Sequence, residues 1–239
     1  SGSMDEAAGS GTKWEAVTSA LTTFVQQPNL DGISVGLQYF GLPPGGGMAC
    51  NTMCQVDADC GSAACGPCFF TGIIGVCLGA SGSDSCNAAD YAVAEVEIAP
   101  LPGVAQAIIG SMANHAPSTG TPTSAALDGA IQHARAWQVA NPSHVTVAVL
   151  ATDGLPQACD TDLNNINAIA AAGANGMPQV LTYVIGVGSE TAALNGIAVA
   201  GGTGQAFLVD ASQDAAQQFL DAMNAIRGTA LSCNYLIPV

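Results

Sequence analysis

Three short segments of the chain carry side-chain oxygens that could hold a divalent metal ion. Ser1 and Ser3 precede one helical pattern, Thr121 precedes another, and Asp153 directly follows an apolar strand pattern. Hydroxyl and carboxylate oxygens are the hard ligands that suit Mg²⁺, Mn²⁺ or Ca²⁺. Each residue alone has a more ordinary use, because Ser and Thr often cap helices and Asp often precedes Gly in turns. Together, they predict a metal site.

These segments can meet if the surrounding elements form a parallel sheet. Apolar residues at helical spacing predict helices over 13–27, 104–114, 123–139, 163–172, 194–200 and 215–227. Alternating or continuous apolar runs predict strands over 33–39, 94–98, 145–151, 180–187 and 206–209. Regular alternation of the two favours a doubly wound α/β fold with a mostly parallel sheet and helices on both faces. In such a sheet, ligands bind at the edge where the strands end.

The four residues resemble the metal-ion-dependent adhesion site of von Willebrand factor type A domains. The family motif is Asp-x-Ser-x-Ser, followed by a distant Thr and then a distant Asp. Ser1 and Ser3 match the two serines, Thr121 lies in a matching Gly-Thr-Pro turn, and Asp153 lies in Thr-Asp-Gly. The resemblance implies a Rossmann-like fold that binds Mg²⁺, or Mn²⁺ or Ca²⁺ in its place.

Two further stretches resemble a bacterial, myxobacterial-type subset of that family with Cys-rich inserts. They are Thr12-Lys13-Trp14 and, near the end, Cys233-Asn234-Tyr235. The resemblance covers the chain outside residues 41–90. It implies one domain over residues 1–239, interrupted by an insert at about 41–90.

The chain departs from the family motif at one position. The first Asp of the motif would stand two residues before Ser1, at the end of the first and central strand. We therefore expect the sheet to lack its middle strand, with the strands at 33–39 and 145–151 flanking a gap. We also expect the metal site to lack one carboxylate.

Nine cysteines predict a disulfide framework and an oxidising compartment. Seven fall in the Gly-rich insert, and Cys233 should reach the opposite face of the domain and stay unpaired. The cysteines expected in disulfides are Cys50, Cys54, Cys60, Cys65, Cys68, Cys77, Cys86 and Cys159. An alternative use of Cys65 and Cys68, as a thioredoxin-like redox pair, would need a strand–helix context that lowers the thiol pKa. A single Cys-x-x-Cys pair disfavours zinc.

The amino-acid composition disfavours several classes of protein function. The chain is 49% hydrophobic and 9% charged, which favours a folded domain over a disordered segment. Its net charge is -15, and its only basic residues are Lys13, Arg135 and Arg227, so nucleic acid and anionic membrane surfaces are poor partners. The apolar runs are shorter than the roughly 18 residues that span a bilayer, so no membrane insertion is expected in this segment.

The sequence therefore predicts binding without catalysis. In the resembling family, an acidic group of a protein or other ligand completes the coordination of the metal. The expected location is extracellular or at the cell surface, and the mode of anchoring, including a lipid anchor before Ser1, stays open. The second hypothesis is a structural surface or matrix domain whose metal only stabilises loops. The third is a thiol oxidoreductase that uses Cys65 and Cys68.

Overall fold

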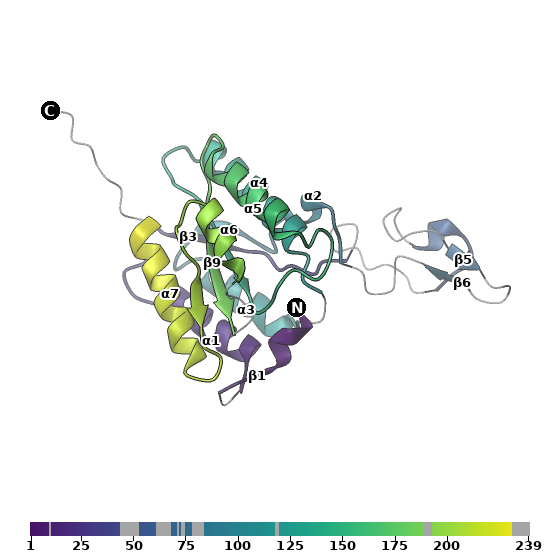
Figure 1. Ribbon diagram of the computed structural model, residues 1–239, viewed down its shortest axis with the longest axis horizontal. Coiled ribbons are helices and arrows are strands. Elements are labelled where there is room, and N and C mark those ends of the chain that lie inside the picture. The colour runs from purple at the N-terminus through teal and green to yellow at the C-terminus, as the bar shows by residue number, and fades with distance from the viewer. Residues whose placement is uncertain are drawn as a thin grey trace.

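The computed structural model describes residues 1–9, 11–43, 53–60, 68–70, 72, 75–77, 84–117, 120–188 and 193–230. The fold is mixed α/β (Figure 1). The α-helices are α1 Lys13–Val25, α2 Ala88–Tyr91, α3 Ala105–Asn114, α4 Thr123–Ala140, α5 Leu163–Ala174, α6 Asn195–Ala200 and α7 Ala215–Ala230. The 3₁₀ helices are η1 Gly2–Asp5 and η2 Asp57–Cys60. The strands are β1 Ala7–Ala8, β2 Gly11–Thr12, β3 Ser34–Leu37, β4 Met53–Cys54, β5 Cys68–Phe70, β6 Gly75–Cys77, β7 Val96–Pro100, β8 Val147–Thr152, β9 Leu181–Val187 and β10 Phe207–Val209.

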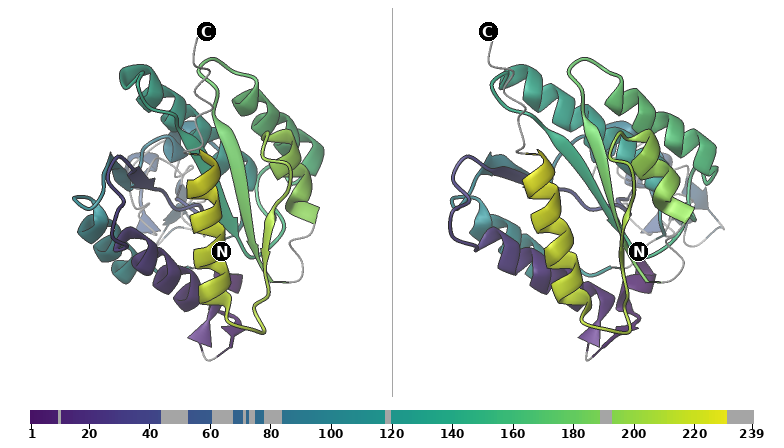
Figure 2. Two further views of the ribbon diagram at one scale, coloured as in Figure 1. Left: turned by 90° about the vertical axis from the view of Figure 1, so that its left-hand side faces the viewer. Right: turned by 60° about the vertical axis from the view of Figure 1, so that its left-hand side comes forward.

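A three-stranded parallel sheet forms the centre of the domain, in the order β10-β9-β8. Successive side chains of β9 point to opposite faces. Tyr183, Ile185 and Val187 pack with residues of α1 and α7, whereas Val184 packs with residues of α4, α5 and α6. Figure 2 shows α7 and the α5–α6 pair on opposite sides of this sheet. Burial on both faces explains why this strand is an almost continuous apolar run.

A second sheet contains only β3 and β7 among the described strands, and these two run antiparallel. Its apolar residues pack with α1 and α3 in a separate cluster that includes Phe24, Leu101 and Ile108. Within the described residues, β3 pairs only with β7, and β8 pairs only with β9. The expected parallel sheet is therefore present in part, because β3 and β7 form a separate sheet instead of joining it.

A capping box fixes the start of α1. The Thr12 hydroxyl accepts a hydrogen bond from the Glu15 amide at 3.1 Å, and the Glu15 carboxylate accepts one from the Thr12 amide at 2.8 Å. Such reciprocal bonds satisfy two amide groups that the helix itself leaves unpaired. The β1–β2 hairpin directly precedes the helix. Lys13 is thus held in the first turn of α1.

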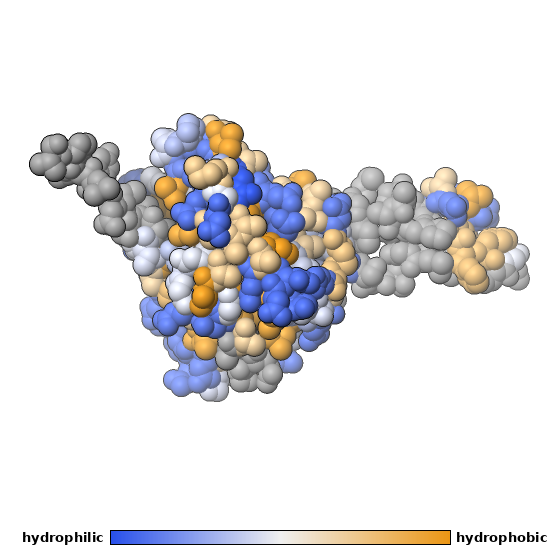
Figure 3. Space-filling model, turned by 45° about the horizontal axis from the view of Figure 1, so that its top comes forward, coloured by the Kyte–Doolittle hydropathy of each residue, from blue (hydrophilic) through white to orange (hydrophobic). Residues whose placement is uncertain are grey.

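The Cys-rich insert contains a small antiparallel sheet in the order β4-β6-β5. A disulfide joins Cys54 to Cys68. In the alternative with a redox pair, Cys68 would instead pair with Cys65, which lies outside the described residues. Phe69 and Phe70 are exposed, and Figure 3 shows apolar residues gathered on this sheet.

Several expected disulfide positions lie outside the described residues. Cys50 and Cys65 belong to this group, as do the side chains of Cys60 and Cys77. Cys233, which is expected to be unpaired, also lies outside the described residues. In the described part of the chain, no helix is long and apolar enough to cross a membrane.

Truncation of Phe219 in α7 should strongly destabilise the domain. This ring is 1% exposed and lies in the cluster between α1, α7 and the parallel sheet. Phe219→Ala is expected to lower the free energy of unfolding by about 3–5 kcal/mol, since it leaves a cavity. Phe69→Ala, which truncates a ring that is 57% exposed, is the matched control and should change it by less than about 1 kcal/mol. Urea unfolding measures both, and equal effects would contradict this assignment of the core.

Candidate cation site

A buried ion pair lies at the end of the central parallel sheet. Asp153 follows the last residue of β8, and its side chain is 0% exposed. Its Oδ2 accepts a hydrogen bond from Lys13 Nζ at 3.3 Å, and the same Nζ donates to Glu6 Oε2 at 2.6 Å. A buried carboxylate is tolerated when an opposite charge compensates it. The first turn of α1 is therefore tied to the end of β8.

The electrostatics of Lys13 fit this arrangement. Burial by itself lowers the pKa of Lys13, but the hydrogen bond to Glu6 and the charge of Asp153 outweigh that effect and raise the pKa above its ordinary value. Lys13 is thus a fixed ammonium between two carboxylates.

The second oxygen of Asp153 is unsatisfied. Within the described residues, Oδ1 is buried and has no hydrogen-bond partner, and the same holds for Oγ1 of Thr123 in the first turn of α4. Leaving a buried polar atom without a partner costs about 1–3 kcal/mol, and more when the group is charged. A carboxylate oxygen in this situation has the chemistry of a cation ligand.

Ser1 and Ser3 lie together and close to this carboxylate. Their hydroxyl oxygens are 2.6 Å apart, and the neighbouring Met4 is buried in the core, which anchors η1. Burial lowers the pKa of the Ser1 amino group. The negative charges of Asp153 and Asp84 oppose that shift, so both carboxylates lie near Ser1. The structure therefore brings both predicted serines to the Asp153 end of the sheet.

Thr121 lies in a loop that packs against the segment after Asp153. It is 1% exposed, and its carbonyl accepts a hydrogen bond from the Gln157 amide at 3.1 Å. The residue that caps α4 is Pro122, with no side-chain capping bond. Thr121 therefore does not cap α4 with its side chain, and its backbone is bonded to the loop that follows Asp153.

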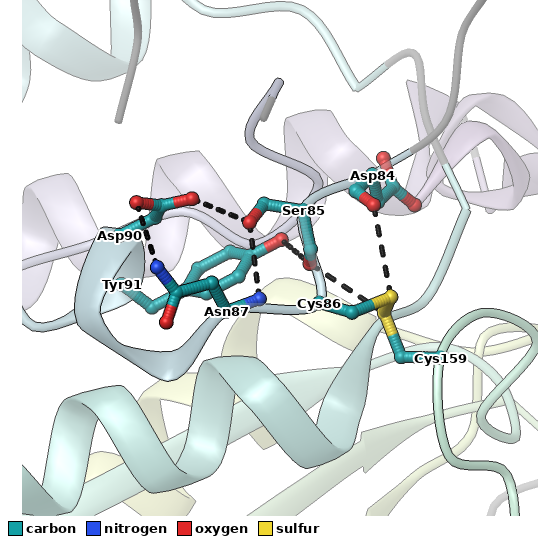
Figure 4. Close-up of a disulfide and its surroundings, with 7 residues drawn as sticks. All are labelled: Asp84, Ser85, Cys86, Asn87, Asp90, Tyr91 and Cys159. Atoms are coloured by element: carbon teal, nitrogen blue, oxygen red, sulfur yellow. Dashed lines mark hydrogen bonds between the residues drawn. A yellow bond between two sulfur atoms is a disulfide. The ribbon is translucent and has the colours of Figure 1, made fainter. Parts of the chain in front are cut away.

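A disulfide joins the end of the insert to the same loop. Cys86 is bonded to Cys159, as Figure 4 shows. Next to it, Tyr91 donates a hydrogen bond from its hydroxyl to the Ser85 carbonyl at 2.9 Å, and burial raises the pKa of Tyr91 to about 12. The insert thus begins after β3 and ends covalently attached beside the predicted site.

Sequence reasoning missed Asp84 at this place. Asp84 is buried, with 8% of its surface exposed. Its Oδ2 lies 2.7 Å from the position that a Cβ on Gly120 would occupy. Gly120 directly precedes Thr121. The signal that could have found Asp84 is its position two residues before Cys86, but only once the partner of Cys86 is known.

The donor set fits hard cations. In the described part of the chain, no group of three or more His, Cys, Asp or Glu side chains is arranged to hold a metal ion. The candidate set instead combines hydroxyls with the carboxylate of Asp153. Neutral and anionic oxygens of this kind suit Mg²⁺, Mn²⁺ or Ca²⁺, whereas zinc sites favour imidazole and thiolate ligands.

A groove lined by aromatic and acidic side chains adjoins this end of the domain. The rings of Tyr39 and His115 stack with centroids 3.6 Å apart, and Trp14, next to Lys13, contacts both. Burial and the charge of the Ser1 amino group lower the pKa of His115, so the groove lies close to Ser1. Glu95 also lines this groove, whose volume is about 600 Å³. The site therefore has an adjacent surface that a ligand could contact.

Comparison of the sequence with models of known protein families gives no match, and comparison with curated proteins gives none either.

Proposed function

We propose that this chain is a von Willebrand factor type A-like domain that binds a partner through a divalent cation. Ser1, Ser3, Thr121 and Asp153 would hold the cation. The observation that carries the proposal is the fully buried Asp153, at the end of a parallel strand, with one carboxylate oxygen that lacks a hydrogen-bond partner among the described residues. That position is the edge at which open α/β sheets bind ligands.

The proposed ligands differ in charge. Asp153 supplies a formal negative charge, and the hydroxyls of Ser1, Ser3 and Thr121 supply neutral oxygens. When bound, the cation would attract an acidic group of the partner to an open coordination position. This matters because the chain carries a net charge of -15, which repels an acidic partner in the absence of a bridging cation.

The fold proposal is that one further strand fits between β3 and β8. Each of these strands has one edge without a strand partner among the described residues. Open strand edges present unpaired amide and carbonyl groups. A strand between them would join the two sheets in the order expected for the family. Such a strand, ending in Asp-x before Ser1, would also add a second family carboxylate to the site.

The proposed location is extracellular or at the cell surface. The Cys54–Cys68 and Cys86–Cys159 disulfides favour an oxidising compartment. They are equally compatible with the second hypothesis, a structural domain whose cation only stabilises its loops. Retention of a carboxylate-bearing ligand on the immobilised domain with Mn²⁺, but not with EDTA, supports binding over a structural role.

The first test removes the carboxylate. Asp153→Ala should abolish Mg²⁺ and Mn²⁺ binding measured by calorimetry, because the remaining predicted ligands carry no negative charge. Asp214→Ala is the control, since Asp214 is remote in sequence and its carboxylate accepts a bond from the amide of Gln217 in α7. Unchanged binding by Asp153→Ala would exclude this edge of the sheet as the metal site.

The second test supplies the proposed strand. A version of the chain that carries a β-strand ending in Asp-x immediately before Ser1 should bind Mg²⁺ about 10–100-fold more tightly, because it gains a ligand and a rigid support. Asp153→Ala in this longer version should remove the gain. Equal affinity of the two versions would contradict the fold proposal while leaving the first test valid.

The third test removes the buried ammonium. Without metal, Lys13→Met should lower the free energy of unfolding by about 3–5 kcal/mol, because it leaves the Asp153 carboxylate uncompensated. Mn²⁺ should stabilise this variant more than the parent chain, since the cation no longer shares Asp153 with an ammonium. Lys13→Arg, which keeps the charge, is the control. Thermal unfolding with and without Mn²⁺ decides, and equal stabilisation of Lys13→Met and the parent would count against a shared carboxylate.

A further inference from the structure

We propose that the Cys-rich insert supplies a second carboxylate, that of Asp84, to the cation site. This inference rests on the proposed function and adds a ligand that the family motif does not contain. It also gives the insert a role, since the Cys86–Cys159 disulfide would hold Asp84 in place.

The position of Asp84 is the first support. Its Oδ2 lies 2.7 Å from the place of a Cβ on Gly120, so the carboxylate packs directly on the backbone next to Thr121. Gly120 leaves the space that this close approach requires, since any other residue would push Asp84 away. Ala158, on the loop that follows Asp153, lies on the same side of Gly120 at 3.3 Å. Asp84 therefore lies where the Thr121 loop meets the loop that follows Asp153.

Charge is the second support. Asp84 is 8% exposed, so its carboxylate is largely removed from water. Two buried carboxylates at the same end of the sheet repel each other, and a divalent cation between them would relieve that repulsion. The unsatisfied Oδ1 of Asp153 is an independent sign that this end of the sheet could accept a cation.

The disulfide is the third support. Cys86 lies two residues after Asp84, and Cys159 lies six residues after Asp153. Their covalent bond limits how far the two acidic segments can separate. A ligand held in place by a covalent link binds more tightly than one on a free loop, because less conformational entropy is lost on binding.

The experiment measures Mn²⁺ binding to the whole chain by calorimetry and by the loss of the free Mn²⁺ signal in electron paramagnetic resonance. Asp84→Asn should weaken binding about 10–100-fold, the usual effect of losing a ligand or its support. Asp5→Asn is the matched control, because it removes the same charge from a residue that belongs to η1 and not to the insert. It should weaken binding less than threefold. Gly120→Ala should weaken binding while it keeps every charge.

The disulfide is tested in the same assay. Replacing both Cys86 and Cys159 with Ser should weaken Mn²⁺ binding, whereas replacing Cys54 and Cys68 should leave it unchanged. Circular dichroism confirms that each variant is folded. If Asp153→Ala abolishes binding but Asp84→Asn and Gly120→Ala bind like the parent chain, the Asp84 inference is wrong and the proposed function stands. If neither Asp153→Ala nor Asp84→Asn alters binding, both are wrong.

Discussion

The ion pair between Lys13 and Asp153 is the interaction on which the arrangement of this domain depends. It joins the first turn of α1 to the end of β8, across 140 positions of sequence. Because the Asp153 side chain is fully buried, its charge has to be balanced within the protein. The capping box at Thr12 and the bond to Glu6 both fix the ammonium in position. The same buried charge that stabilises the fold is therefore the feature that could recruit a cation.

Elements with long, regular apolar patterns could be predicted from the sequence. The strand expected over 180–187 is Leu181–Val187, and the helix expected over 163–172 is Leu163–Ala174. A strand that is buried on both faces is continuously apolar, and a helix that is buried along one stripe has apolar residues at helical spacing. The β1–β2 hairpin and the four-residue α2 escaped prediction, because elements so short show no period. The antiparallel pairing of β3 with β7 also escaped it, since residue patterns do not report strand direction.

Candidate site residues could be predicted where a polar side chain stands directly at the end of a predicted strand or at the start of a predicted helix. Asp153 follows an apolar strand and Thr121 precedes a helix, so both could be placed at one edge of the sheet. Asp84 could not be placed in this way, because it lies in a segment without periodic pattern. Its position follows from the bond between Cys86 and Cys159, and the pairing of cysteines is not encoded in their spacing. Covalent chemistry thus determines the part of the site that secondary structure does not.

The Cys86–Cys159 bond also has a mechanical consequence. It closes a loop of chain with a sequence separation of 73 residues, which includes α3, α4, β7 and β8. A force that pulls on the two ends of the chain passes through the disulfide and bypasses everything inside that loop. Fully extended, those residues would measure about 250 Å at roughly 3.4 Å per residue. With this bond intact, the domain can therefore lengthen under tension by about that much less than with this bond reduced.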